Sequence, residues 1–168
     1  HVTARVPQYP IGVSGLTADR LAAIGPDRDR IQTIPNGIDY EKIRTTEPVV
    51  DGFDVLFAGR LIEDKRVDLL LQAFDRVVSE EMTLGIVGDG PKRAELETLA
   101  GTLKCADRIT FTGFLEEYDD VLAQMRAASV FATPSTREGF GITAAEAMAA
   151  GCTVIGADHP DSAVGEVI

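Results

Sequence analysis

The chain has 168 residues, of which 45% are hydrophobic, and it carries a formal net charge of −11 at pH 7. This length and apolar content predict one compact domain with a substantial core, and no apolar run reaches the roughly 20 residues that span a bilayer. The excess of carboxylates excludes a general affinity for nucleic acid, because phosphate contacts need a surplus of Lys and Arg.

Short β-like runs alternate with amphipathic helical stretches along the chain, which is the pattern of a parallel sheet covered on both faces. The elements expected in the first part are a strand at 11–14, a helix at 17–24 capped by Ser14 or Thr17, a strand at 31–34, a turn at 35–39 and a surface loop at 45–52. No internal repeat or low-complexity tract interrupts this order.

The body of the chain repeats a strand, a turn and a helix about four times. The expected strands are 54–58, 83–87, 108–112, 128–134 and 152–156, and the expected helices are 66–78, 91–103, 119–127 and 142–150. After Asp158 a further helix begins and the sequence stops, so we expect a piece cut from a longer protein. The predicted fold class is α/β, a Rossmann-like three-layer domain with a mostly parallel sheet.

The segment 138–151 carries the clearest chemistry. Gly139 and Gly141 permit a sharp turn that leaves amide groups bare at the start of an apolar helix, and such a helix start attracts phosphates. Glu146 lies on the second turn of this helix, close enough to reach a bound ligand, and Glu138 precedes the turn and would face the same ligand. For Glu146, an ion pair or a helix-dipole partner is the alternative interpretation.

Ligands of open α/β sheets bind beyond the carboxyl ends of the strands, where the turns converge on one crevice. Arg60 follows the glycine after one strand, and Lys65 starts the next helix, so two cations stand where the phosphates of a nucleotide would lie. Glu146 would then accept the ribose hydroxyls. Surface cations, and a simple tight connection for the glycine turn 88–91, are the structural alternatives.

The composition of the chain bears on its cellular compartment and on its adaptation to salt. Cys105 and Cys152 lack metal-ligand spacing and are expected to be buried free thiols in a reducing cytosol, while residues 1–7 lack a signal-peptide pattern. Four Lys stand beside twelve Arg in an Asp-rich chain, which favours a halophilic protein over an ordinary acidic cytosolic one.

Four landmarks, in this order and at these separations, resemble the C-terminal donor-binding domain of a retaining glycosyltransferase of family 4 with the GT-B architecture. They are Ile-Pro-Asn-Gly-Ile-Asp at 34–39, Gly-Arg-Leu at 59–61 with Lys65, Gly-Asp-Gly-Pro at 88–91, and Glu-Gly-Phe-Gly at 138–141 with Glu-Ala-Met-Ala-Ala-Gly at 146–151. The resemblance covers residues 14–166, and Glu138 and Glu146 match the family's paired-glutamate motif.

The resemblance implies a role for each matching position. Arg60 and Lys65 would hold the diphosphate of a nucleotide-sugar donor, Glu146 its ribose, and Glu138 would lie beside its sugar. The implied catalytic residues are Arg60, Lys65 and Glu138. The implied donor-binding residues are Gly59, Arg60, Lys65, Thr112, Gly113, Phe114, Leu115, Glu138, Phe140, Gly141, Ile142 and Glu146. No metal and no cofactor are expected, since the cations stabilise the leaving diphosphate.

The expected activity is transfer of a sugar with retention of configuration to an unidentified acceptor. The N-terminal domain that would bind the acceptor is expected to lie outside this sequence, so the fragment is expected to bind donor without transferring it. The expected protein is cytoplasmic, and full-length it is a candidate for peripheral attachment at the membrane. Two positions depart from the family, namely Arg66, where relatives carry glycine, and Ser162-Ala163, where relatives show a glycine pair before the Glu166 position.

The rival functions fall into three classes. A phosphorylase or a nucleotide-sugar epimerase would share the two-domain architecture, and a module without catalysis would only sense nucleotide sugars. Retention of Arg60, Lys65, Glu138 and Glu146 together speaks against such a module. An NAD-dependent oxidoreductase is disfavoured because the turn at 88–90 lacks the third glycine of the dinucleotide fingerprint, Arg93 standing at that position.

Overall fold

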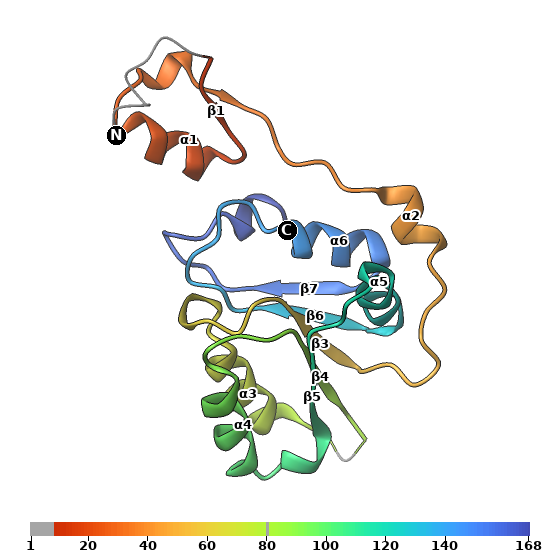
Figure 1. The fold of residues 1–168 in the computed structure, drawn as a ribbon. Helices are drawn as coiled ribbons and strands as arrows, with labels where there is room; N and C mark the ends of the chain where they lie inside the picture. The colour runs from red at the N-terminus through yellow and green to blue at the C-terminus, as the bar shows by residue number, and fades with distance from the viewer. Residues whose placement is uncertain (1–8, 80) are drawn as a thin grey trace.

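The computed structural model describes residues 9–79 and 81–168. Its centre is a five-stranded parallel sheet with the strand order β5-β4-β3-β6-β7 (Figure 1). The strands are β3 (Val55–Ala58), β4 (Leu84–Val87), β5 (Ile109–Gly113), β6 (Val130–Thr133) and β7 (Thr153–Gly156). Every neighbouring pair of these strands is parallel, which confirms the predicted sheet.

Helices cover both faces of this sheet (Figure 1). One face carries α3 (Val67–Val77) and α4 (Arg93–Gly101), and the other carries α2 (Tyr40–Thr45), α5 (Tyr118–Ala127) and α6 (Ile142–Ala150). Each set of helices packs an apolar cluster of its own against the strands. The predicted three-layer α/β architecture is therefore confirmed.

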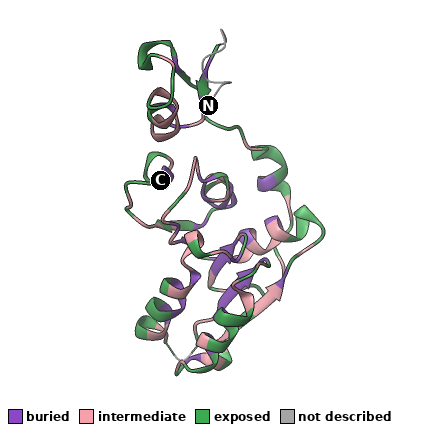
Figure 2. Ribbon diagram, turned by 60° about the vertical axis from the view of Figure 1, so that its left-hand side comes forward, coloured by how far each residue is buried: buried purple, intermediate pink, exposed green. Residues whose placement is uncertain are grey.

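The alternation of side chains along β3 explains why both clusters form. Phe57 packs in the cluster with α3 and α4, whereas Leu56 and Ala58 pack in the cluster with α5 and α6. Successive side chains of a strand point to opposite faces, so a central parallel strand is apolar throughout. Buried residues accordingly concentrate along the strands of the sheet (Figure 2).

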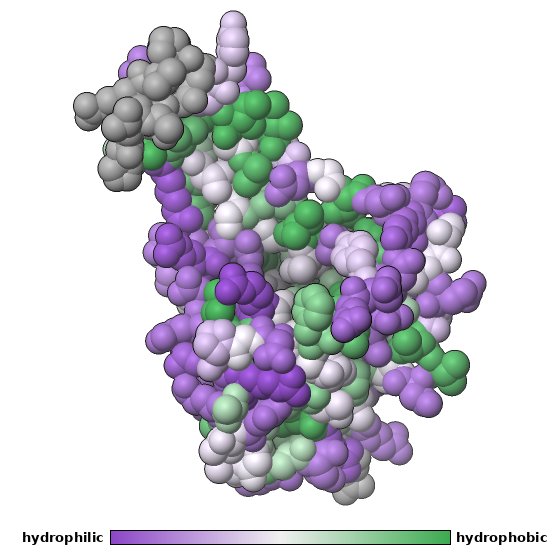
Figure 3. Space-filling model, in the orientation of Figure 1, coloured by the Kyte–Doolittle hydropathy of each residue, from purple (hydrophilic) through white to green (hydrophobic). Residues whose placement is uncertain are grey.

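A second, two-stranded parallel sheet lies in the first part of the chain. It pairs β1 (Ile11–Gly12) with β2 (Gln32–Thr33), and α1 (Gly15–Ala22) connects them. We refer to residues 9–34 as the N-terminal unit, which an extended segment joins to α2 (Figure 1). Hydrophobic side chains gather on it in the surface view, whereas hydrophilic ones cover most of the remaining face (Figure 3).

Ser14 caps α1, as the sequence predicted. The amide of Thr17 donates to Oγ of Ser14 at 3.0 Å, and the amide of Ser14 donates to Oγ1 of Thr17 at 2.8 Å. This reciprocal cap starts the helix two residues before the predicted position. The expected absence of a signal sequence concerns residues 1–7, which lie outside the described residues.

One predicted helix is wrong, and one helix was not predicted. The helix α2 lies between the turn expected at 35–39 and the surface loop expected at 45–52 and overlaps that loop only at Thr45; Asp39 caps it by accepting from the amide of Lys42 at 3.0 Å. The helix expected after Asp158 is a short 3₁₀ turn, η5 (Val164–Glu166). Within the described ranges, no helix has the length and hydropathy needed to cross a membrane.

Candidate functional site

A pocket of about 230 Å³ opens where β3, β4 and β5 end. Its lining residues are Ala58, Gly59, Arg60, Val87, Gly88, Asp89, Phe114, Leu115, Val121 and Thr143. Gly59, Arg60, Phe114 and Leu115 are predicted site residues that the fold brings together here. The carboxyl ends of parallel strands meet at one edge of a sheet, which places these turns around one hollow.

Close backbone contacts hold the three turns around the pocket. The amide of Gly59 donates to the carbonyl of Val87 at 3.0 Å, and the amide of Gly88 donates to the carbonyl of Gly113 at 2.8 Å. Gly88 has a φ of +130°, and a Cβ on it would lie 2.0 Å from the carbonyl oxygen of Gly59. Glycine at 88 is therefore required for the turns to approach so closely.

The start of α6 borders the pocket through Thr143. Gly141 precedes the helix with a φ of +96°, and no side chain in the described part of the chain caps it. The first amides of an uncapped helix attract anions. The predicted residues Phe140, Gly141 and Ile142 lie at this helix start.

Lys65 and Glu138 form an ion pair with each other, and neither lines the pocket. The ammonium nitrogen of Lys65 lies 2.5 Å from Oε2 of Glu138, and the two side chains are 22% and 21% exposed. The other carboxylate oxygen of Glu138 accepts from the amide of Gly139 at 3.1 Å. The structure thus brings two predicted residues from distant turns into direct contact.

Glu146 is buried and hydrogen-bonded to a residue that the sequence did not single out. The hydroxyl of Tyr118, the first residue of α5, donates to Oε1 of Glu146. Burial raises the pKa of the Glu146 carboxyl, and the bond from Tyr118 opposes that rise. Burial, followed by the bond to Glu146, raises the pKa of Tyr118. Within residues 9–79 and 81–168, Glu146 thus has a hydrogen bond to a tyrosine and forms no ion pair.

Arg66 occupies a backbone conformation that favours glycine. Its φ of +47° lies in the left-handed region, which glycine adopts without strain. The guanidinium makes two bonds to Asp68, from Nε to Oδ1 at 3.0 Å and from Nη2 to Oδ2 at 2.9 Å. This pair holds the pKa of Asp68 below its usual range and offsets the strain of the turn.

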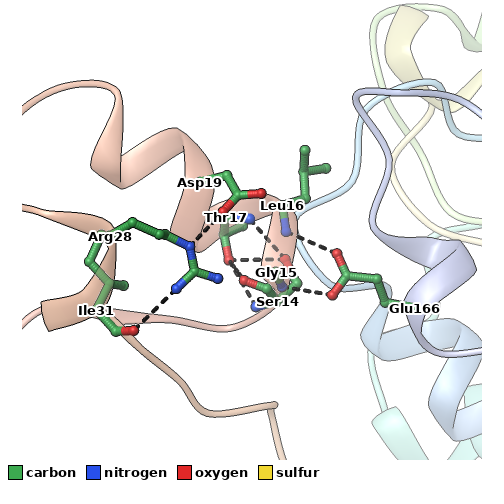
Figure 4. Close-up of polar contacts among 8 residues, drawn as sticks. All are labelled: Ser14, Gly15, Leu16, Thr17, Asp19, Arg28, Ile31 and Glu166. Carbon is green, nitrogen blue, oxygen red and sulfur yellow. Dashed lines mark hydrogen bonds and ion pairs between the residues drawn. The ribbon is translucent and has the colours of Figure 1, made fainter.

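Glu166 reaches the N-terminal unit. Its carboxylate oxygens accept from the amide of Gly15 at 2.7 Å and from the amide of Leu16 at 2.9 Å, at the start of α1 (Figure 4). In the opposite direction, Oγ of Ser14 donates to the carbonyl of Gly139 at 2.7 Å. The altered segment after Ser162 therefore connects α1 with the loop that carries Glu138.

The remaining predicted residues lie at or near the same edge of the sheet. Thr112 and Gly113 end β5, and the hydroxyl of Thr112 donates to the carbonyl of Gly113 at 3.0 Å. Val121 and Thr143 also line the pocket, although the sequence analysis missed them. A signal for Thr143 was available, because it follows Ile142 at the predicted helix start.

A larger hollow of about 540 Å³ is lined by residues 62–64 and 66–68, the start of α4 and Thr136. Most of its charges are paired with one another, as in the pairs of Lys92 with Glu95 and of Arg66 with Asp68. Over residues 9–79 and 81–168, no group of three or more potential ligands is placed to hold a metal ion.

The chain is similar to known proteins both in sequence and in structure. A family model described as "Glycosyl transferases group 1" matches residues 39–167. The 2-deoxystreptamine glucosyltransferase of Streptomyces kanamyceticus is 34% identical over 82% of this chain and 36% of its own length. The D-inositol 3-phosphate glycosyltransferase of Xylanimonas cellulosilytica is 34% identical over 83% of this chain and 37% of its own length.

Solved structures show the same fold. The crystal structure of Anabaena Alr3699/HepE in complex with UDP-glucose matches 98% of this chain and 48% of its own, with a TM-score of 0.82 and 23% identity. The lipopolysaccharide outer core galactosyltransferase WaaB in its apo form matches 90% of this chain and 43% of its own, with a TM-score of 0.72 and 25% identity.

The fold is thus one half of a GT-B glycosyltransferase, as the resemblance implied. The chain spans little more than a third of the length of the curated relatives and less than half of the solved chains. From the family match, which covers most of the chain, we conclude that this protein belongs to the group 1 glycosyl transferases, glycosyltransferase family 4.

Proposed function

We propose that the chain binds a nucleotide-sugar donor and that the intact protein transfers the sugar to an acceptor with retention of configuration. The observation that carries this proposal is the pocket that gathers the ends of β3, β4 and β5 beside the uncapped start of α6. A nucleoside diphosphate needs an apolar wall for its base and positive charge or free amides for its phosphates.

The residues around the pocket divide between these tasks. Phe114 and Leu115 form an apolar wall suited to a base, and Arg60 supplies a cation at the rim. Lys65 supplies a second cation, which Glu138 holds in place without a ligand. Both cations and the amides of α6 would stabilise the negative charge that grows on the departing diphosphate. These groups can offset that charge without a metal ion, and we therefore propose a metal-free site.

The glutamates would contact different parts of the donor. Glu146 lies one turn inside α6 and would accept from the ribose, whereas Glu138 lies beside Lys65 and would face the sugar. The solved Anabaena protein, which holds UDP-glucose, supports a sugar nucleotide as donor. The names of the two sequence relatives, a glucosyltransferase and a glycosyltransferase, support sugar transfer as the reaction.

Two further properties belong to the proposal. An acceptor-binding domain is proposed for the intact protein, supported by the limited share of each relative that this chain covers. A cytoplasmic location is proposed because Cys105 and Cys152 are both free and buried, as expected in a reducing compartment.

Calorimetric titration of the intact protein with UDP, GDP and ADP, and then with their sugar conjugates, tests the proposal. We expect saturable binding of one nucleotide, lost in Arg60→Ala and kept in Arg76→Ala, which removes an exposed arginine on α3. Glu146→Ala should weaken the binding of the free nucleotide more than Glu138→Ala does. A folded protein that binds none of these ligands would contradict the proposal, and equal losses in the two glutamate variants would contradict their assigned roles.

A further inference from the structure

The two carboxylate oxygens of Glu146 have different surroundings. Tyr118 donates its hydroxyl to Oε1. Among the residues that the structure describes, none donates a hydrogen bond to Oε2. The residue is only 7% exposed, and burial disfavours the charge of its carboxylate, whose Oε2 has no described donor. Such an oxygen is ready to accept from a ligand.

This hydrogen bond lies next to the pocket. Val121 lines the pocket and stands three residues after Tyr118 on α5, while Thr143 lines it and stands three residues before Glu146 on α6. Residues three apart share one face of a helix. Tyr118 and Glu146 do not line the pocket themselves, but they lie on the helix faces that carry Val121 and Thr143.

The ring of Tyr118 is held from its outer side. The ammonium nitrogen of Lys42, on α2, lies 5.6 Å from the centroid of the ring, and Lys42 also pairs with Asp119, the next residue of α5. A cation over a tyrosine face is attracted to the ring. These contacts favour one orientation of the phenol, the one in which its hydroxyl points at Glu146.

We propose that Tyr118 is a positioning residue of the donor site, which holds one oxygen of Glu146 so that the other accepts the ribose hydroxyls of the nucleotide. This inference rests on the proposed donor function and deepens it. The bond has two effects on Glu146, since it fixes the rotation of the carboxylate and favours its charged form, which is the stronger acceptor.

The test compares Tyr118→Phe with the parent in the intact protein, by calorimetric titration with UDP and with its 2′,3′-dideoxy analogue. We expect about a tenfold loss of UDP affinity, because Glu146 would lose the contact that fixes the rotation of its carboxylate and favours its charged form. The dideoxy analogue should bind both proteins equally, because it lacks the hydroxyls that Glu146 would accept. Tyr40→Phe, at a half-exposed position of α2, is the matched control and should bind UDP like the parent.

The pH profile separates positioning from a structural role. Without the phenol, burial alone acts on Glu146, so UDP affinity in Tyr118→Phe should fall at a higher pH than in the parent as the solution is acidified. The charged groups around the pair are Lys42, Asp39 and Asp119, and they are the same in both proteins.

Any of three results for Tyr118→Phe would overturn the proposal. The first is a UDP affinity and a pH profile unchanged from the parent, and the second is a loss of affinity for the dideoxy analogue as large as the loss for UDP. The third is tighter binding of UDP than in the parent, which would make the phenol a competitor of the ribose. Should Tyr118→Phe fail to fold, Lys42→Ala decides in its place, with a smaller loss expected for UDP alone. If the parent protein itself binds no UDP, the nucleotide named in the proposed function is wrong. This outcome differs from the three above, in which the parent binds UDP and only the role of Tyr118 is refuted.

Discussion

Replacing Gly88 with alanine tests whether close approach of the turns builds the pocket. The backbone of Gly88 has a φ of +130°, a region nearly restricted to glycine, and adopting it costs another residue about 1–3 kcal/mol. The added Cβ would lie 2.0 Å from the carbonyl oxygen of Gly59, where backbone and not a flexible side chain must move. Overpacking of this kind costs a further ~1–3 kcal/mol.

Gly88→Ala should therefore lower the free energy of unfolding by about 3 kcal/mol or more, which for a domain of this size lowers Tm by roughly 6–12 °C. Thermal unfolding followed by circular dichroism measures the change. Gly101→Ala is the matched control, because it ends α4 and its added Cβ meets no described atom within 4 Å. Alanine there is expected to leave Tm unchanged or to raise it. A Gly88→Ala protein that melts within about 2 °C of this control would refute the steric reasoning behind these magnitudes.

Three further predictions concern charge. Glu146→Gln should stabilise the ligand-free protein at neutral pH. The reason is that a carboxyl whose pKa is raised in the folded state contributes stability that is full below its unfolded pKa and is lost as pH rises through the folded pKa. Denaturation of both proteins at several pH values checks this, and equal stability at neutral pH would contradict it. Glu166→Ala should lower the free energy of unfolding by about 1 kcal/mol, as loss of a helix cap does, and should speed hydrogen exchange at the amides of Gly15 and Leu16. Unchanged exchange at these two amides would exclude a capping role for Glu166. Molar KCl should raise Tm if the charge of −11 reflects salt adaptation, and an unchanged Tm would remove that idea.

The strands and most helices were predictable because each has a clear pattern of apolar residues. The helix α3, for example, buries Val67, Leu70, Leu71 and Phe74 at helical spacing. By contrast, α2 has six residues and buries only Ile43, so its sequence holds no periodicity that distinguishes it from a loop. Ser14 was one of the two residues predicted to cap α1, and it does so. The helix was nevertheless predicted to start at Thr17, two residues late, because either Ser14 or Thr17 is a suitable cap.

The pocket residues that follow strands were predictable for a topological reason. Gly59 and Phe114 come directly after parallel strands, and the carboxyl ends of such strands meet at one edge. Tyr118 had no such signal, because its contact with Glu146 joins residues 28 apart and depends on how α5 packs against α6. The contact of Glu166 with Gly15 joins residues 151 apart, and local sequence does not specify it.

These unforeseen contacts share one physical role, which is to hold α6 and the loop before it in a costly arrangement. Ser14 holds the carbonyl of Gly139 and Tyr118 holds the carboxylate of Glu146, while the helix start itself is uncapped and the carboxylate is buried. An uncapped start and a buried charge both reduce the stability of a ligand-free fold. A nucleotide that occupied the site would relieve both at once, since its phosphates would accept from the bare amides and its ribose would donate to the carboxylate. The expected gain in stability of Glu146→Gln and its expected loss of nucleotide affinity therefore have one cause, namely a site whose polar groups are completed by the ligand and not by the protein.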